Sequence, residues 1–181
     1  MRAAYRVRLM ANLVNGSTLA GLLVAAAGRA SLARATDGLL VGVRYRLPVP
    51  VAPAFTVGNV ILARGDRAAL AAMRPLLAHE ARHATQYAWC GGLVMLPLYF
   101  LAAGVSWGLT GDFGARNVFE RQAGLADGGY TDKPLRPVLT PVRPVRRPVG
   151  GTRGIIRLPR GPRRRAGDGD AGSRDGGVPL C

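Results

Sequence analysis

The residues of this chain that can do chemistry are few, because its 181 residues include only two histidines and two glutamates. Three of these four lie in one motif, H-E-A-R-H, as His79, Glu80 and His83, and the fourth is Glu120. Two histidines four residues apart project from one face of a helix, so both imidazoles can reach a single ion. The motif therefore predicts a zinc site on a helix.

The position of Glu80 predicts a catalytic role rather than a ligand role. Glu80 directly follows His79, which rotates it off the face that His79 shares with His83. From there its carboxylate misses the metal, but it can reach a water molecule on the metal and take its proton. We therefore expect Glu80 to be the general base in the hydrolysis of a peptide or protein substrate, with Zn²⁺ as cofactor.

A catalytic zinc ion needs a third protein ligand and one open position. Cys90 follows too soon on the same helix, and Asp112 lies in a loop flanked by glycines. Glu120 is therefore predicted to be the third ligand, with Asp112 as the alternative. Asp127, two turns beyond Glu120, is predicted either to accept the second ring N–H of a ligand histidine or to form the turn that ends the helix.

Two helices are predicted to carry these residues. Asp66 has the character of an N-cap, and residues 67–89 are rich in Ala and Leu. Pro75 is expected either to kink this helix or to mark its true start, one turn before the motif. Residues 115–126 are predicted to form the helix that holds Glu120. Its end is indicated by a pair of glycines.

The segment before the motif predicts a small sheet and an N-terminal helix. Residues 40–47 and 55–63 are dense in Val and Leu and are expected to form two short strands. Residues 1–35 run from a basic start into an uncharged stretch, 9–28, which contains four polar residues. These residues favour a packed or amphipathic helix, while a signal or an anchor remains the alternative.

A second uncharged segment, 88–111, lies between the motif and Glu120 and is long enough to cross a bilayer. A single crossing would place His83 and Glu120 on opposite sides of the hydrocarbon layer, so they could not share an ion. We therefore predict a buried or re-entrant helical hairpin, bent at its glycines or at Pro97. We also predict that both ends of this segment lie on the same side of any membrane, and that the segment can rest on the membrane surface.

The C-terminal residues 133–181 are rich in Pro, Arg and Gly and are predicted to be disordered. They hold 12 Lys and Arg against 3 Asp, so they supply +9 of the formal charge of +15. This charge can attract an anionic lipid surface or a nucleic acid. Because no aromatic residue follows Tyr130, specific reading of a nucleic acid is disfavoured.

The segment AFTVGNVILARGD, followed by LLAHEARHATQY, is similar to the metallopeptidase core domain found with bacterial extracellular contractile injection systems. In that family an A-F-T-x-G-N-x-I strand precedes a helix with L-L-A-H-E-x-x-H-x-x-Q. The resemblance covers residues 54–87. It implies a small zincin-like fold, a strand at 56–63 along the cleft, zinc on the two histidines and the intervening glutamate as base. The later run N-x-F-E-x-x-A, 117–123, looks like the glutamate-bearing helix of gluzincins.

These features predict an α+β, mainly helical chain with three parts. They are an N-terminal apolar helix at 1–35, a zincin-like metal-binding domain at 36–132 and a disordered tail at 133–181. The predicted function is that of a bacterial zinc-dependent metallopeptidase, cytoplasmic or associated with a membrane. The alternative is a catalytically inactive protein that binds zinc or a membrane surface and interacts through its basic tail.

Overall fold

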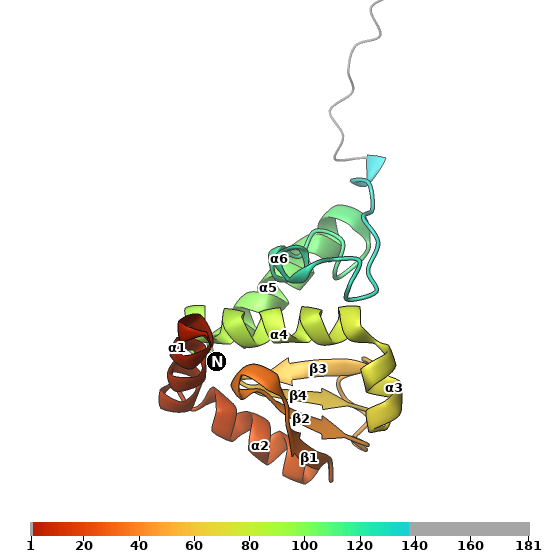
Figure 1. Cartoon of the computed structure of the whole chain (residues 1–181). Helices are drawn as coiled ribbons and strands as arrows, with labels where there is room; N and C mark the ends of the chain where they lie inside the picture. The colour runs from red at the N-terminus through yellow and green to blue at the C-terminus, as the bar shows by residue number, and fades with distance from the viewer. Residues whose placement is uncertain (1, 138–181) are drawn as a thin grey trace, which may run out of the picture. The chain divides into compact units, whose positions relative to one another are not determined.

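The computed structural model describes residues 2–137, so most of the predicted tail lies outside the described residues (Figure 1). The described part is an α+β structure in which helices outweigh a small mixed sheet, as the sequence predicted. Its elements are α1 (Ala3–Val14), α2 (Ser17–Ala27), β1 (Ser31–Arg34), the 3-10 turn η1 (Thr36–Gly38), β2 (Leu40–Val43), β3 (Ala54–Val57), β4 (Val60–Ala63), α3 (Arg67–Ala72), α4 (Arg74–Trp89), α5 (Met95–Thr110) and α6 (Val118–Ala123).

The sheet has the strand order β1-β2-β4-β3, in which β2 and β4 are parallel and the other neighbours are antiparallel. The single strand predicted at 55–63 is wrong, because this segment is a hairpin of β3 and β4. Gly58 makes the turn with a φ of +61°, and a Cβ on it would lie 2.5 Å from the carbonyl carbon of Ser17. The strand predicted at 40–47 ends early, because Arg44 also has a positive φ.

Helix α4 lies beside the outer strand β3 (Figure 1). The predicted helix 67–89 is in fact two helices, because Met73 leaves helical geometry with a ψ of 56°. Asp66 caps the first of them by accepting a hydrogen bond from the Ala69 N–H at 2.8 Å. Pro75 lies in the first turn of α4 and marks its start, which was one of the two predicted roles.

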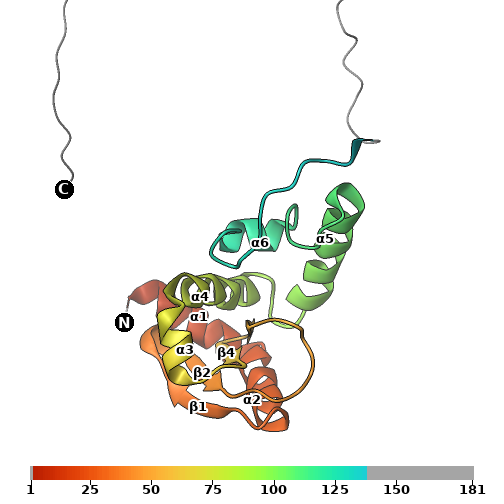
Figure 2. The ribbon, with the colours of Figure 1, turned by 90° about the vertical axis from the view of Figure 1, so that its right-hand side faces the viewer.

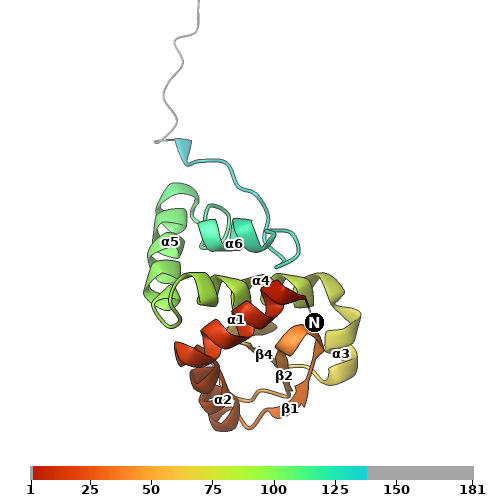
Figure 3. The same cartoon turned by 60° about the vertical axis from the view of Figure 1, so that its left-hand side comes forward.

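The N-terminal helices pack on the rest of the structure through polar side chains. Figure 3 shows α1 crossing α4, with α2 along the sheet. Asn12 is buried and donates to the Ala84 carbonyl oxygen at 2.8 Å and to Asn59 Oδ1 at 3.1 Å. Asn59 in turn donates to Thr18 Oγ1 at 2.9 Å. The polar residues that interrupt the apolar stretch 9–28 thus join α1 and α2 to the sheet turn and to α4.

Residues 88–111 do not form the predicted pair of short helices. They contain the end of α4, a turn at Gly91 and Gly92, and one continuous helix, α5. Both turn glycines have a positive φ, so the bend falls at one of the predicted places. Pro97 does not break α5, because it lies in the first turn, where its missing N–H is not needed.

No single helix in residues 2–137 has the length and apolar character to cross a membrane. Only α1 and α2 together meet that test, and they are bent by 72° relative to each other. The first residues of the predicted disordered tail are ordered against α5. The Arg136 N–H donates to the Leu109 carbonyl oxygen at 2.9 Å, and Lys133 Nζ pairs with Asp112 Oδ2 at 2.7 Å.

Candidate metal centre

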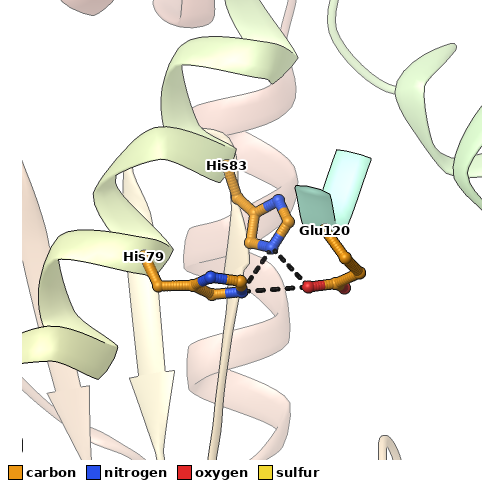
Figure 4. Close-up of side chains that lie close together, drawn as sticks. All are labelled: His79, His83 and Glu120. Atoms are coloured by element: carbon orange, nitrogen blue, oxygen red, sulfur yellow. Dashed lines mark hydrogen bonds and ion pairs between the residues drawn. The ribbon is translucent and has the colours of Figure 1, made fainter. Parts of the chain in front are cut away.

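His79, His83 and Glu120 converge between α4 and α6 (Figure 4). The two Nε2 atoms of the histidines are 3.0 Å apart. Glu120 Oε2 lies 3.1 Å from His79 Nε2 and 3.7 Å from His83 Nε2. Within the described residues this is the one cluster of three His, Cys, Asp or Glu side chains with the spacing of a metal site. The structure therefore brings together all three predicted ligands.

The spacing of the three donor atoms fits a tetrahedral ion. Zinc holds nitrogen and oxygen ligands at about 2.0–2.1 Å, which places two tetrahedral ligands about 3.3–3.4 Å apart. The three observed separations of 3.0, 3.1 and 3.7 Å lie on both sides of this value. A tetrahedral ion on these atoms would have a fourth position that none of the three residues fills.

The ring of His79 is oriented by main-chain carbonyls at the end of α6. Its Nδ1 lies 3.1 Å from the Ala123 carbonyl oxygen and 3.0 Å from that of Gly124. Because both neighbours are acceptors, Nδ1 carries the proton and Nε2 presents its lone pair to the cluster. This is the tautomer that a metal ligand needs.

The ring of His83 is oriented in the same sense by Gln86. His83 Nδ1 lies 2.7 Å from Gln86 Oε1, and Gln86 Nε2 donates to the Phe119 carbonyl oxygen at 2.9 Å. The second bond fixes which end of the amide faces His83, because only the NH₂ group can donate to a carbonyl. His83 Nδ1 is therefore the donor to Gln86, and its Nε2 also presents a lone pair.

Glu120 is held as a charged carboxylate. The Tyr99 hydroxyl on α5 donates to Glu120 Oε1, whereas Oε2 is buried and faces His79 Nε2 and His83 Nε2 at 3.1 and 3.7 Å. Burial acts to raise the pKa of Glu120, but the interactions with His79, His83 and Tyr99 lower it to about 2. An ionised carboxylate oxygen that faces two imidazole nitrogens in a buried site is a donor set that suits a cation.

Helix α6 is short, and a side-chain cap fixes its start. Asn117 is fully buried, and its side-chain oxygen accepts a hydrogen bond from the Phe119 N–H at 3.0 Å. Phe119 packs with Tyr87 of α4 and Met95 of α5. These contacts bring Glu120 toward the histidine face of α4.

Glu80 lies next to this cluster and is held by the sheet. Its Oε2 accepts a hydrogen bond from the Thr56 hydroxyl of β3 at 2.7 Å. Burial raises the pKa of Glu80 above its usual range, although Thr56 and the nearby histidines act in the opposite direction. A buried carboxylate with a raised pKa suits a group that takes and returns a proton near neutral pH.

The loop after α6 covers the His79 ring. A Cβ built on Gly128 would lie 2.5 Å from His79 Cε1, so only glycine allows this close approach. Asp127 does not accept a hydrogen bond from a ligand histidine, because its Oδ2 pairs with Arg82 Nη1 at 2.8 Å. Arg82, within the motif, is thereby directed toward Asp127, and both side chains are partly exposed.

The other predicted ligand candidates lie apart from the cluster. Asp112, the alternative third ligand, caps the turn after α5 by accepting from the Gly114 and Ala115 N–H groups at 2.9 and 3.0 Å. Cys90 is likewise absent from the cluster.

Three residues that form hydrogen bonds with the site side chains were not predicted from the sequence. They are Tyr99, Thr56 and Gln86. Gln86 had a signal, because it occupies the glutamine of the H-E-x-x-H-x-x-Q pattern. Thr56 likewise falls within the A-F-T-x-G-N-x-I pattern. No sequence signal marked Tyr99, because it lies inside an apolar segment and contacts Glu120 only when α5 and α6 pack together.

No family model, curated protein or solved structure matches this chain.

Proposed function

We propose that the chain is a zinc-dependent metallopeptidase, of the kind that its motif resembles. The observation that carries the proposal is the convergence of His79 Nε2, His83 Nε2 and Glu120 Oε2 in one buried site. The Nδ1 neighbours of both histidines support it, because they set the tautomer that binds metal.

Zinc held by these three ligands would polarise a carbonyl group and lower the pKa of a water molecule. Glu80 would accept the proton of that water and pass it to the leaving amine. Thr56 orients the carboxylate by its bond to Oε2, which leaves the second oxygen available for proton transfer. β3 is the outer strand of the sheet beside α4, so an extended peptide could add to it as a further strand.

A second function, non-catalytic zinc binding, has its own supporting observation. The three ligands are nearly inaccessible, with exposed fractions of 3% for His79, 7% for His83 and 2% for Glu120. Structural zinc sites are closed to solvent, whereas catalytic sites keep an open position. Under this alternative the ion ties α6 to α4 and takes part in no reaction.

Metal analysis combined with a hydrolysis assay distinguishes the two functions. The wild type and Glu80→Gln are each expected to bind one zinc ion, while His79→Ala, His83→Ala and Glu120→Ala lose it. With fluorescein-labelled casein as substrate, only the wild type is expected to release fluorescent peptides.

Three outcomes would count against the proposal or part of it. Zinc in the wild type without hydrolysis would favour the non-catalytic function. Equal hydrolysis by Glu80→Gln would remove Glu80 from the base role, and full zinc retention by Glu120→Ala would remove Glu120 from the ligand set.

A further inference from the structure

Helix α5 exposes an apolar surface. Its sixteen residues include no charged side chain, and only Met95, Ala103 and Ser106 are buried. Tyr99 completes this inward stripe and faces Glu120. The outward side chains are large and apolar, and exposed fractions reach 67% at Phe100 and Leu101. Figure 2 shows α5 standing apart from the sheet, next to α6.

The apolar surface of α5 continues onto the neighbouring helices. Residues 9–28 and 84–111 both lack charged side chains, and they meet at the turn between α4 and α5, where a Cβ on Gly92 would lie 2.7 Å from Asn15 Cγ. Trp89, at the end of α4, is 85% exposed. Two segments far apart in the sequence thus form one uncharged end of the molecule, which we call the apolar end. Its most exposed large side chains are Met10, Val14, Leu19, Leu23, Trp89, Val94, Phe100, Leu101 and Val105.

Basic residues lie next to the apolar end. The Arg136 guanidinium lies over the Trp107 ring at 5.1 Å, and Trp107 stacks on Phe113. Lys133 pairs with Asp112 and Arg116 pairs with Asp132, and Arg116 also donates to the Lys133 carbonyl oxygen. The whole chain has 25 Lys and Arg against 10 Asp and Glu. Aromatic rings beside cations are typical of the boundary between bilayer headgroups and acyl chains.

We infer that the apolar end docks on a bilayer that contains anionic lipid. Protein–protein interfaces have a polar rim that forms hydrogen bonds with the partner. The outward side chains of α5 offer almost no hydrogen-bonding groups. At about 1.5 Å per residue α5 is about 24 Å long, less than the hydrocarbon core of about 30 Å, so it rests in the interface. Arg136 and the formal net charge of +15 supply attraction to anionic headgroups.

This docking does not depend on hydrolysis, although it bears on substrate access. The inward stripe of α5 holds Glu120 through Tyr99, so the metal cluster lies directly behind the docked helix. A substrate would then bind to the metal cluster close to the membrane surface. Failure of zinc binding would leave the docking intact, and failure of docking would leave the zinc site intact.

Vesicle flotation of the full chain tests the inference, with Trp89 and Trp107 as built-in probes because they are the only tryptophans. Vesicles of phosphatidylcholine with phosphatidylglycerol are expected to bind the protein and to shift its tryptophan emission to the blue. Part of the binding should persist at about 1 M salt, where the screening length is about 3 Å and the basic residues contribute little.

The test variant is Phe100→Glu with Leu101→Glu. The matched control is Val49→Glu with Val51→Glu, which adds the same charge at positions that are 64% and 95% exposed, in the segment between β2 and β3 and outside residues 9–28 and 84–111. The double variant should lower vesicle affinity by at least about tenfold, since two apolar side chains no longer enter the bilayer. The control should bind as the wild type does.

Two results would overturn the inference. One is equal vesicle binding by the double variant and the wild type. The other is absence of vesicle binding together with a concentration-dependent dimer that the double variant abolishes, because the apolar end would then bind a second copy of the chain. Circular dichroism of the double variant shows whether it is folded. If it is not, Phe100→Ser with Leu101→Ser takes its place.

Discussion

At the scale of single residues, Gln86 orients the His83 ring toward the proposed metal position. Gln86→Leu keeps the side-chain volume but removes the acceptor for His83 Nδ1. We expect zinc affinity to fall by about 10–100-fold, the range found for partners of ligand histidines. Competition with a chromogenic zinc chelator measures this loss. Gln122→Leu is the control, because Gln122 is exposed and its Oε1 accepts a 3.4 Å hydrogen bond from Gln86 Nε2, not from His83. Equal losses in both variants would contradict the orienting role.

The pH dependence of zinc binding also follows from single residues. Burial lowers the pKa of His79, but the hydrogen bond and charge of Glu120 raise it by more, so the net pKa lies above the usual His range. Protonated His79 cannot bind zinc, so affinity should decrease as the pH falls through this raised pKa, beginning above the usual value of about 6.5. Zinc titrations from pH 8 to pH 6 would measure the effect, and a constant affinity would contradict it.

The metal-free protein should show the opposite trend. A raised folded-state pKa at His79 and Glu80 means that each group stabilises the fold below its unfolded-state pKa and loses that contribution as the pH rises. The melting temperature without zinc should therefore decline from pH 5 to pH 8, a range that starts just above the usual carboxyl pKa and includes the usual imidazole pKa. In Glu80→Gln the decline should be smaller, because one of the two groups no longer titrates.

At the scale of elements, the sequence predicted correctly those features that depend on residues next to each other in the chain. Asp66 and Pro75 mark helix starts by their own backbone preferences, and the H-E-x-x-H spacing needs only a helix to act. The β3–β4 hairpin was missed because the turn at Gly58 lies within one apolar run and depends on close packing against Ser17. The contact between Tyr99 and Glu120 arises from helix packing, which no local pattern records.

The loop after α6 provides an element-scale prediction. Gly128→Ala would place a methyl group about where the His79 ring now lies, 2.5 Å from Cε1, so the ring or the loop must move. We expect zinc affinity to fall while the sheet and helices stay folded, as a chelator titration and circular dichroism would show. Gly104→Ala is the control, since its Cβ would meet nothing within 4 Å. It should keep zinc and gain about 0.5–1 kcal/mol of stability.

At the scale of the molecule, the helix that carries His79 and His83 is packed against the N-terminal part of the chain. Residues 1–35 were divided from the predicted metal-binding domain, but a packed or amphipathic helix was the favoured prediction for them. The structure has two packed helices there, with α1 across α4 and α2 on β3 and β4. A Cβ on Gly21 would lie 2.4 Å from the Val57 carbonyl oxygen, so α2 and β3 are in direct contact. The helix that carries both histidines is thus supported by the sheet and α1, and by α6 at the metal cluster.

Asn12 is the residue through which this dependence can be tested. Its side chain is fully buried and donates to the Ala84 carbonyl oxygen, one residue after His83, and to Asn59. Asn12→Ala would leave the buried Asn59 Oδ1 without its Asn12 donor, at a cost of about 1–3 kcal/mol, and would remove a second hydrogen bond from the Ala84 carbonyl oxygen. We expect the melting temperature to fall by several degrees and zinc affinity to weaken with it. Val14→Ala, at an exposed position of the same helix, should change neither quantity. If Asn12→Ala melted at the wild-type temperature, α1 would be an appendage and the support of α4 would have to come from the sheet alone.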